Sequence, residues 1–239
     1  MPQSFQIELG GNRTVTALSY PAAAPVGATL VLGHGAGANQ QSEFMTGFAI
    51  ALAGRGLDVV TFNFPFTERG RKLPDPQPVL ESCFRAVIEQ VATLPGFGAQ
   101  PLFIGGKSLG GRMASHVAAA PDAGEQGPPA WWAQLRGLVF LGYPLHPPGR
   151  PQQVRVSHLA HVTHPMLFVQ GERDAFGTPQ ELRAFVDVLS APCTLHAVAH
   201  GGHSLDVPKR LGVPQSEIYA GVQDTIAAWI RERLEPPSV

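Results

Sequence analysis

The stretch PLFIGGKSLGGRMA, residues 101–114, joins an apolar strand-like run to a helix-like run through a glycine-rich turn. The turn contains the pattern Gly-x-Ser-x-Gly, with Ser108 between Gly106 and Gly110. Small flanking residues let a chain turn sharply from strand to helix and project a strained serine hydroxyl. The bare pattern arises by chance in roughly one such sequence in seven, so the flanking strand and helix carry most of the weight. Together they favour a nucleophilic Ser108 over a turn with an N-capping serine.

Strand-like and helix-like segments alternate along the rest of the chain. The run at 28–33 is continuously apolar, which is typical of a strand buried on both faces of a mainly parallel sheet. This alternation predicts an α/β fold in which helices cover both faces of the sheet. We expect strands at 4–9, 13–20, 28–33, 57–63, 101–105, 138–142, 166–170 and 194–199. We expect helices at 42–54, 79–94, 109–120, 179–190 and 215–234.

Length and charge limit the classes of protein to which the chain can belong. A chain of 239 residues suits one domain built on an open sheet, so we expect a single domain over 1–239. The formal net charge is −1 and the basic residues are scattered, which argues against a nucleic-acid partner. Neither a signal peptide nor an apolar run of about 18 residues is evident, so no membrane association is expected. We expect a cytoplasmic monomer or small homo-oligomer.

Cysteine and histidine offer the main alternative chemistry. Cys83 and Cys193 give neither a disulfide framework nor a paired Cys-x-x-Cys site. Three histidines recur every third residue in one loop, at His158, His161 and His164. Such a loop leaves a metal-dependent hydrolase open as an alternative, because zinc needs several ligands that converge on one point. We nevertheless expect no metal and no cofactor.

Two later segments supply the partners of a serine nucleophile in the required chain order of serine, acid and histidine. His203 follows Gly-Gly after the last expected strand, where it can accept the Ser108 proton and return it to the leaving group. Asp174 follows the strand at 166–170 and can orient the imidazole. Glu172 and Asp206 are the alternative acids. Asp174 is preferred because it lies deeper in its loop.

Backbone amides are expected to stabilise a developing oxyanion. Leu109, directly after the nucleophile, is one expected donor. The second donor is expected from the loop HGAGAN at 34–39, whose small residues let amides approach a ligand closely. Ala36 is the preferred donor there, with Gly35 and Gly37 as alternatives.

A substrate pocket is expected from residues that follow the carboxyl ends of strands, where ligands bind in open α/β sheets. Lys107 is expected either in this pocket or as the structural partner of a carboxylate beneath the site. The charged loop at 67–72, which contains Arg69, is expected either to bind an anionic group of the substrate or to contact only solvent. The expected pocket residues are His34, Lys107, Tyr143, His146 and Arg69.

On these motifs the chain resembles the α/β-hydrolase superfamily over nearly its whole length, and its compactness resembles the dienelactone-hydrolase-like branch. Within that branch, the chain resembles a small group of bacterial proteins with eukaryotic relatives, on Lys-Ser-Leu-Gly-Gly-Arg together with GYPLHPPG at 142–149. The resemblance implies an α/β-hydrolase fold of about eight strands and the triad named above. Dienelactone hydrolases use a cysteine nucleophile, so their named activity does not carry over to Ser108. The matching motifs are LVLGHGAGAN (30–39), GGKSLGGR (105–112), QGERDAFG (170–177) and GGHSL (201–205).

The expected function is hydrolysis of a carboxylic ester or thioester of a small substrate through an acyl-Ser108 intermediate. About 23 residues separate the strands ending near 142 and beginning at 166, too few for a large lid. An alternative is an interaction module that keeps the triad but catalyses little, because a fold does not determine a function. The acyl group, the leaving group and the preference among ester, thioester and amide stay open at this point.

Overall fold

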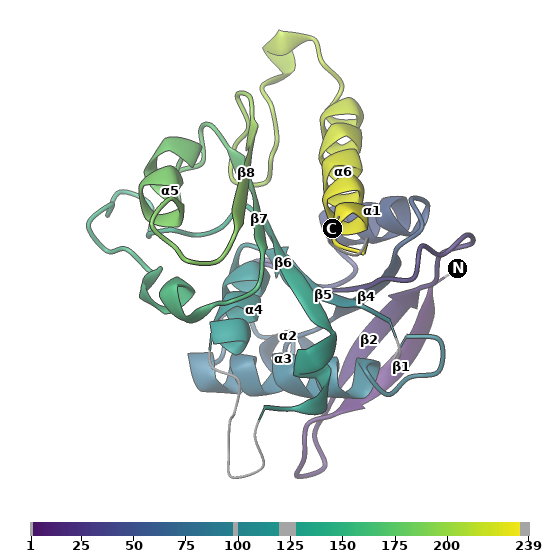
Figure 1. Cartoon of the computed structure of the whole chain (residues 1–239). Helices are drawn as coiled ribbons and strands as arrows, with labels where there is room; N and C mark the ends of the chain where they lie inside the picture. The colour runs from purple at the N-terminus through teal and green to yellow at the C-terminus, as the bar shows by residue number, and fades with distance from the viewer. Residues whose placement is uncertain (1, 98–99, 120–127, 235–239) are drawn as a thin grey trace.

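The structure is a computed structural model that describes residues 2–97, 100–119 and 128–234. Within these residues eight strands form one sheet in the order β1-β2-β4-β3-β5-β6-β7-β8 (Figure 1). Each expected strand is present, with bounds that differ from the expected ones by three residues at most. The strands are β1 (Gln3–Glu8), β2 (Thr14–Tyr20), β3 (Thr29–Gly33), β4 (Asp58–Phe62), β5 (Leu102–Lys107), β6 (Leu135–Leu141), β7 (Met166–Gly171) and β8 (Cys193–Val198).

The sheet is parallel except at β2, which runs antiparallel to both β1 and β4. β3, β4, β5, β6, β7 and β8 pair in parallel, so their carboxyl ends meet along one edge. The register there aligns Gly33 with Gly106, and Lys107 with Leu141. The loop after β3 therefore begins beside the turn that carries Ser108. This alignment confirms the expected fold class and places three loops at a single edge.

Helices cover both faces of the sheet (Figure 1). Apolar side chains from α1 and α6 pack on one face, while those from α3, α4 and α5 pack on the other. An ion pair of 2.7 Å between Arg55 and Asp224 joins the first pair of helices. Alternating residues of β3 supply both cores, because successive strand side chains point to opposite faces. The helices are α1 (Glu43–Ala53), α2 (Pro65–Glu68), α3 (Gln77–Val91), α4 (Leu109–Ala119), α5 (Pro179–Val186) and α6 (Gln215–Glu232).

Short helical turns are the elements that periodicity did not predict. They comprise α2 and three 3-10 turns, each too short to show a repeating apolar pattern. The expected helix over 109–120 is described only as far as Ala119. Residues 143–165, all of them described, hold a single 3-10 turn and no cap over the sheet edge. Among the described helices, none is long and apolar enough to cross a membrane. The 3-10 turns are η1 (Ala130–Gln134), η2 (Ser157–His161) and η3 (Lys209–Leu211).

Candidate active site

Ser108 occupies the sharp turn between β5 and α4. Its φ of +50° is in the left-handed region that non-glycine residues rarely adopt, so the turn is strained. A Cβ at Gly110 would lie 2.0 Å from the carbonyl oxygen of Gly33, and one at Gly106 would lie 2.2 Å from the same atom. Both positions therefore require glycine. The crossing of β3 past the start of α4 is close enough to hold Ser108 in this conformation.

Ser108, His203 and Asp174 form a continuous hydrogen-bonded chain. The Ser108 hydroxyl lies 2.8 Å from Nε2 of His203, and Nδ1 of His203 lies 2.8 Å and 2.9 Å from the Asp174 carboxylate oxygens. A carboxylate can only accept, so Nδ1 carries the proton and Nε2 is left as the acceptor for the hydroxyl. Glu172, an alternative acid, instead accepts from the backbone amide of His200. The geometry therefore selects Asp174 as the partner of His203.

Asp174 is held from several directions at once. Its side chain is shut off from solvent, and Oδ1 accepts from the backbone amide of Phe176 at 2.8 Å. Oδ2 accepts from the side-chain amide of Gln170 at 2.8 Å. The fully buried Gln170 also exchanges hydrogen bonds with the backbone of Tyr143, and it donates to the Gly177 carbonyl. Gln170 thus fixes both the carboxylate and the loop around it.

Gln170 and Phe176 are residues that sequence reasoning did not identify. The Phe176 ring stacks on the His203 imidazole with ring centroids 4.1 Å apart. It limits rotation of the imidazole and screens one face of it from water. Gln170 lies near the carboxyl end of the strand that precedes Asp174, and a polar residue at that position is the sequence feature that could have indicated a role in the site. Phe176 lies two residues after Asp174.

The loop after β3 lies against the nucleophile. A Cβ at Gly35 would be 3.7 Å from Cβ of Ser108, which places the Gly35 backbone beside the reactive serine. Ala36 follows directly, and Leu109 is the first residue of α4. The first amides of a helix have no partner inside the helix. Ala36 therefore follows a residue that lies beside Ser108, and Leu109 follows Ser108 directly, while their role as oxyanion donors stays a prediction.

His34 differs from its expected place in the pocket wall. It is fully buried, and burial lowers its pKa to about 4. Nδ1 donates to the carbonyl of Gly35, while Nε2 accepts from the backbone amide of Phe64 and from the Thr67 hydroxyl. The neutral imidazole therefore braces the loop after β3 against the start of α2. It shapes the site without lining it.

Tyr143 and His146 also turn away from the sheet edge. The fully buried Tyr143 hydroxyl contacts Ser115 at 3.1 Å and His158 at 3.3 Å, and burial raises its pKa to about 12. His146 is buried as well, with Nδ1 donating to the Pro147 carbonyl. Neither side chain is available to a substrate in this structure. Both follow a strand end in sequence, but the chain bends inward there to complete the core.

The two expected cations of the pocket are both paired. Arg69 directs one guanidinium nitrogen at both oxygens of Asp75, at 2.6 Å and 2.7 Å. Lys107 is buried and donates to the carbonyl of His203 at 2.8 Å. The lysine is therefore structural, but its hydrogen-bond partner is a backbone carbonyl and not the carboxylate that was expected. Arg71 also contacts Asp75, at 3.4 Å, so the two guanidinium groups share one buried carboxylate.

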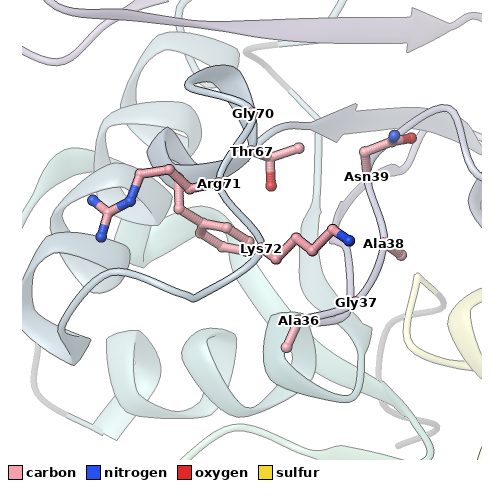
Figure 2. A pocket seen from close by; sticks show the side chains of 9 residues that line it. Ala36, Gly37, Ala38, Asn39, Thr67, Gly70, Arg71 and Lys72 are labelled. Carbon is pink, nitrogen blue, oxygen red and sulfur yellow. The ribbon is translucent and has the colours of Figure 1, made fainter.

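A hollow of about 470 Å³ opens beside the loop after β3. Figure 2 shows Lys72 lying across it toward Ala38 and Asn39, whereas the guanidinium of Arg71 points away. Ala36 lines the same hollow, so the pocket begins where one oxyanion donor is expected. The pocket is lined by Ala36, Gly37, Ala38, Asn39, Phe66, Thr67, Gly70, Arg71 and Lys72.

The histidine loop does not assemble a metal site. Among the described residues, no three His, Cys, Asp or Glu side chains gather around a common point. His158 instead stacks on His116, with ring centroids 3.6 Å apart, and contacts the Ser115 hydroxyl at 2.8 Å. Ser115 is fully buried, so this second Ser–His pair is closed to substrate.

Comparison with known proteins gives a consistent assignment of the fold. Residues 26–231 match the sequence model of an alpha/beta hydrolase domain family. A dienelactone hydrolase from Anabaena variabilis is 18% identical and superposes with a TM-score of 0.71, covering 97% of this chain and 98% of that one. A serine hydrolase without a lid from Xanthomonas campestris is 19% identical, with a TM-score of 0.67 and coverage of 100% and 96%. A cold-adapted esterase from an Arctic intertidal metagenomic library is 20% identical, with a TM-score of 0.66 and coverage of 98% and 94%.

Proposed function

This chain belongs to the alpha/beta hydrolase family, and we propose that it is a serine hydrolase that cleaves a carboxylic ester or thioester of a small molecule. The observation that carries the proposal is the continuous contact from Ser108 through His203 to Asp174. A serine hydroxyl is a weak nucleophile by itself, and an adjacent oriented base activates it. The serine and esterase descriptions of the structural neighbours agree with this chemistry.

The reaction begins when Oγ of Ser108 attacks the carbonyl carbon of the substrate. His203 takes the hydroxyl proton at Nε2, and Asp174 stabilises the imidazolium that forms. The carbonyl π electrons move to the oxygen, which the amides of Leu109 and Ala36 then hold. Collapse of this tetrahedral species expels the alcohol or thiol, which leaves with the proton from Nε2. An acyl-Ser108 ester remains.

Water completes the cycle by the same route. His203 takes a proton from a water molecule, whose oxygen attacks the acyl carbon, and the second tetrahedral species expels Ser108. The proton returns to Oγ of Ser108, so the enzyme is regenerated and a carboxylic acid is released. No redox partner or metal enters this balance. Ser108 is partly exposed, which gives both substrate and water access to its hydroxyl.

The hollow beside Ala36 is the proposed binding site for the part of the substrate next to the scissile carbonyl. A carbonyl oxygen held by the Ala36 amide would direct one substituent into that hollow. Its volume suits a small group, and the buried Phe66 gives it an apolar floor. The absence of a cap over described residues 143–165 leaves the other substituent open to solvent. These features favour short, water-soluble esters or thioesters over long-chain lipids.

Labelling with a fluorophosphonate probe tests this proposal directly. The phosphonate should attach to Oγ of Ser108 in the parent protein, and peptide mass spectrometry should locate it there. Ser108→Ala and His203→Ala should both abolish the adduct. Ser115→Ala is the matched control, because Ser115 also contacts a histidine but is buried, and this variant should still be labelled at Ser108.

Failure of the folded parent protein to react would contradict the proposal. An adduct at any other serine, or one that persists in His203→Ala at the parent rate, would contradict the assigned roles. Unlabelled parent protein would then be tested on matched acetyl and butyryl esters and thioesters. The kcat/KM values would identify the preferred acyl group, from acetyl against butyryl, and the preferred leaving group, from ester against thioester.

A further inference from the structure

Lys107 connects the two reactive residues through a contact that the proposed mechanism does not use. It is the last residue of β5 and directly precedes Ser108. Its side chain is 8% exposed, and Nζ donates to the backbone carbonyl of His203 at 2.8 Å. The residue before the nucleophile therefore holds the backbone of the residue that carries the base. A hydrogen bond with a charged donor is stronger than one between neutral groups.

The adjacent strand end is shaped to admit this contact. Gly142 follows β6 with φ +65°, a conformation that favours glycine. A Cβ there would lie 2.4 Å from the carbonyl oxygen of His203 and 3.3 Å from Nζ of Lys107. The same point lies 3.4 Å from Nδ1 of His203, so Nζ and Nδ1 are no more than about 7 Å apart. Any larger residue at 142 would push the lysine and the histidine backbone apart.

The surroundings of the ammonium group explain how a cation is kept in a buried place. Desolvation lowers the pKa of Lys107 to about 8, and the negative charges of Asp174 and Asp206 oppose that shift. Nζ also lies 6.0 Å from the centre of the Phe44 ring of α1. The two carboxylates therefore favour the charged form of the lysine in this buried place. Two carboxylates, one imidazole and one aromatic ring face it.

We propose that Lys107 is a positioning residue for His203, because its buried ammonium group tethers the backbone carbonyl of the residue that carries the base. The inference rests on the proposed function, since it assigns Lys107 a task in the same site. The tether keeps Nε2 aligned with Ser108.

Two substitutions at Lys107 test the tether. Lys107→Gln removes the charged donor, and Lys107→Arg keeps a charged donor at the same position. Lys209→Gln is the matched control, because Lys209 is exposed and lies outside the site. The kcat and KM for a neutral ester are measured for each variant. In parallel, the histidine ring signals of parent and variants are compared by NMR at one fixed pH, with His203→Gln used to assign the His203 signals.

In Lys107→Gln, we expect kcat to fall by about 10- to 100-fold while KM for the neutral ester changes little. The His203 ring signals should also change, because the imidazole loses its alignment with Ser108. Lys107→Arg should recover part of kcat and move the ring signals back toward those of the parent. A merely structural lysine would lower stability without this selective loss of kcat. A parent-like kcat in folded Lys107→Gln, or an equal loss in Lys107→Arg, would overturn the proposal.

Gly142→Ala provides a second route to the same contact without changing Lys107, should Lys107→Gln fail to fold. The added Cβ displaces the His203 carbonyl from Nζ, so kcat should fall, and a parent-like kcat would overturn the tether. The NMR comparison requires no turnover. If no ester is hydrolysed and Ser108 resists the fluorophosphonate, the proposed function fails while the change in the His203 ring signals still decides the inference on Lys107.

Discussion

The side-chain amide of Gln170 donates to Oδ2 of Asp174 across 2.8 Å, and neither side chain is accessible to solvent. Gln170 stands at the end of β7, whereas Asp174 lies in the loop beyond it. The same amide group also holds the backbone of Tyr143 and the carbonyl of Gly177. The orientation of the acid is therefore coupled to the packing of two loops at the sheet edge.

Replacement of Gln170 by leucine should reduce both activity and stability. A hydrogen bond to a charged carboxylate contributes about 1.5–3 kcal/mol. If Asp174 loses that contribution to its orientation in the transition state, kcat should fall by roughly 10- to 100-fold. The backbone groups of Tyr143 and Gly177 lose their partner as well, and the free energy of unfolding should fall by about 2–4 kcal/mol. Ester kinetics and urea unfolding measure the two effects. A parent-like kcat in folded protein would show that Asp174 is oriented without Gln170.

Asp174→Asn should lower kcat by about 10³- to 10⁴-fold. It should also lower the free energy of unfolding by about 1–3 kcal/mol, because the buried NH₂ group would face a donor, either the Gln170 side-chain amide or the Phe176 backbone amide. The amide occupies the same volume, but its NH₂ group favours the histidine tautomer that carries the proton on Nε2, which then cannot accept from Ser108. Steady-state kinetics on an ester found in the substrate screen measures the loss. Glu172→Gln is the control, because Glu172 lies in the same loop but contacts the His200 backbone rather than His203, and it should keep most of the activity. Equal losses in both variants would contradict the assignment of the acid.

Gly110→Ala should destabilise the fold by more than about 3 kcal/mol, because the added methyl group would lie 2.0 Å from the Gly33 carbonyl oxygen. Gly221→Ala is the opposite case. A Cβ at Gly221, within α6, would meet no atom within 4 Å, so alanine should stabilise the helix by about 0.5–1 kcal/mol. Unfolding in urea compares the two variants. A mild effect of Gly110→Ala would mean that β3 and α4 can separate at little cost.

The stacked pair His116 and His158 should make the protein sensitive to acid. Burial lowers the pKa of His116 to about 4, and burial together with the neighbouring positive groups lowers that of His158 to about 3. The unfolded chain binds these protons near pH 6.5, so the free energy of unfolding falls as the pH drops from 6.5 toward 4. Above pH 6.5 both rings are neutral in either state, and this effect disappears.

Urea unfolding at pH 7, 6, 5 and 4 measures this sensitivity. The double variant His116→Gln with His158→Gln removes both titrating rings and should lose less stability over the same range, even if its stability at pH 7 is lower. His200→Gln serves as a control because His200 is exposed and lies outside the stack. Equal slopes in the parent and the double variant would show that carboxylates alone govern the acid response.

The order of strands and helices could be predicted because each carries its own local pattern. Continuous apolar runs mark the buried strands, and helical spacing of apolar residues marks the longer helices, so the bounds agree within a few residues. The short helix α2 escaped prediction, since four residues cannot display a helical repeat. Ser108, Asp174 and His203 could be named because chain order and glycine spacing reflect the geometry of a strand-to-helix turn.

The sequence by itself determined the fold class, the turn at Ser108 and the order in which its partners follow, because these depend on neighbours in the chain. Only the tertiary structure decided which polar side chains face the pocket and which face the core. Tyr143 and His146 turn inward, Arg69 pairs with Asp75, and Lys107 reaches the carbonyl of His203, which is 96 residues away. Such contacts depend on the register of neighbouring strands and on the space left by Gly142, which the local sequence pattern does not encode.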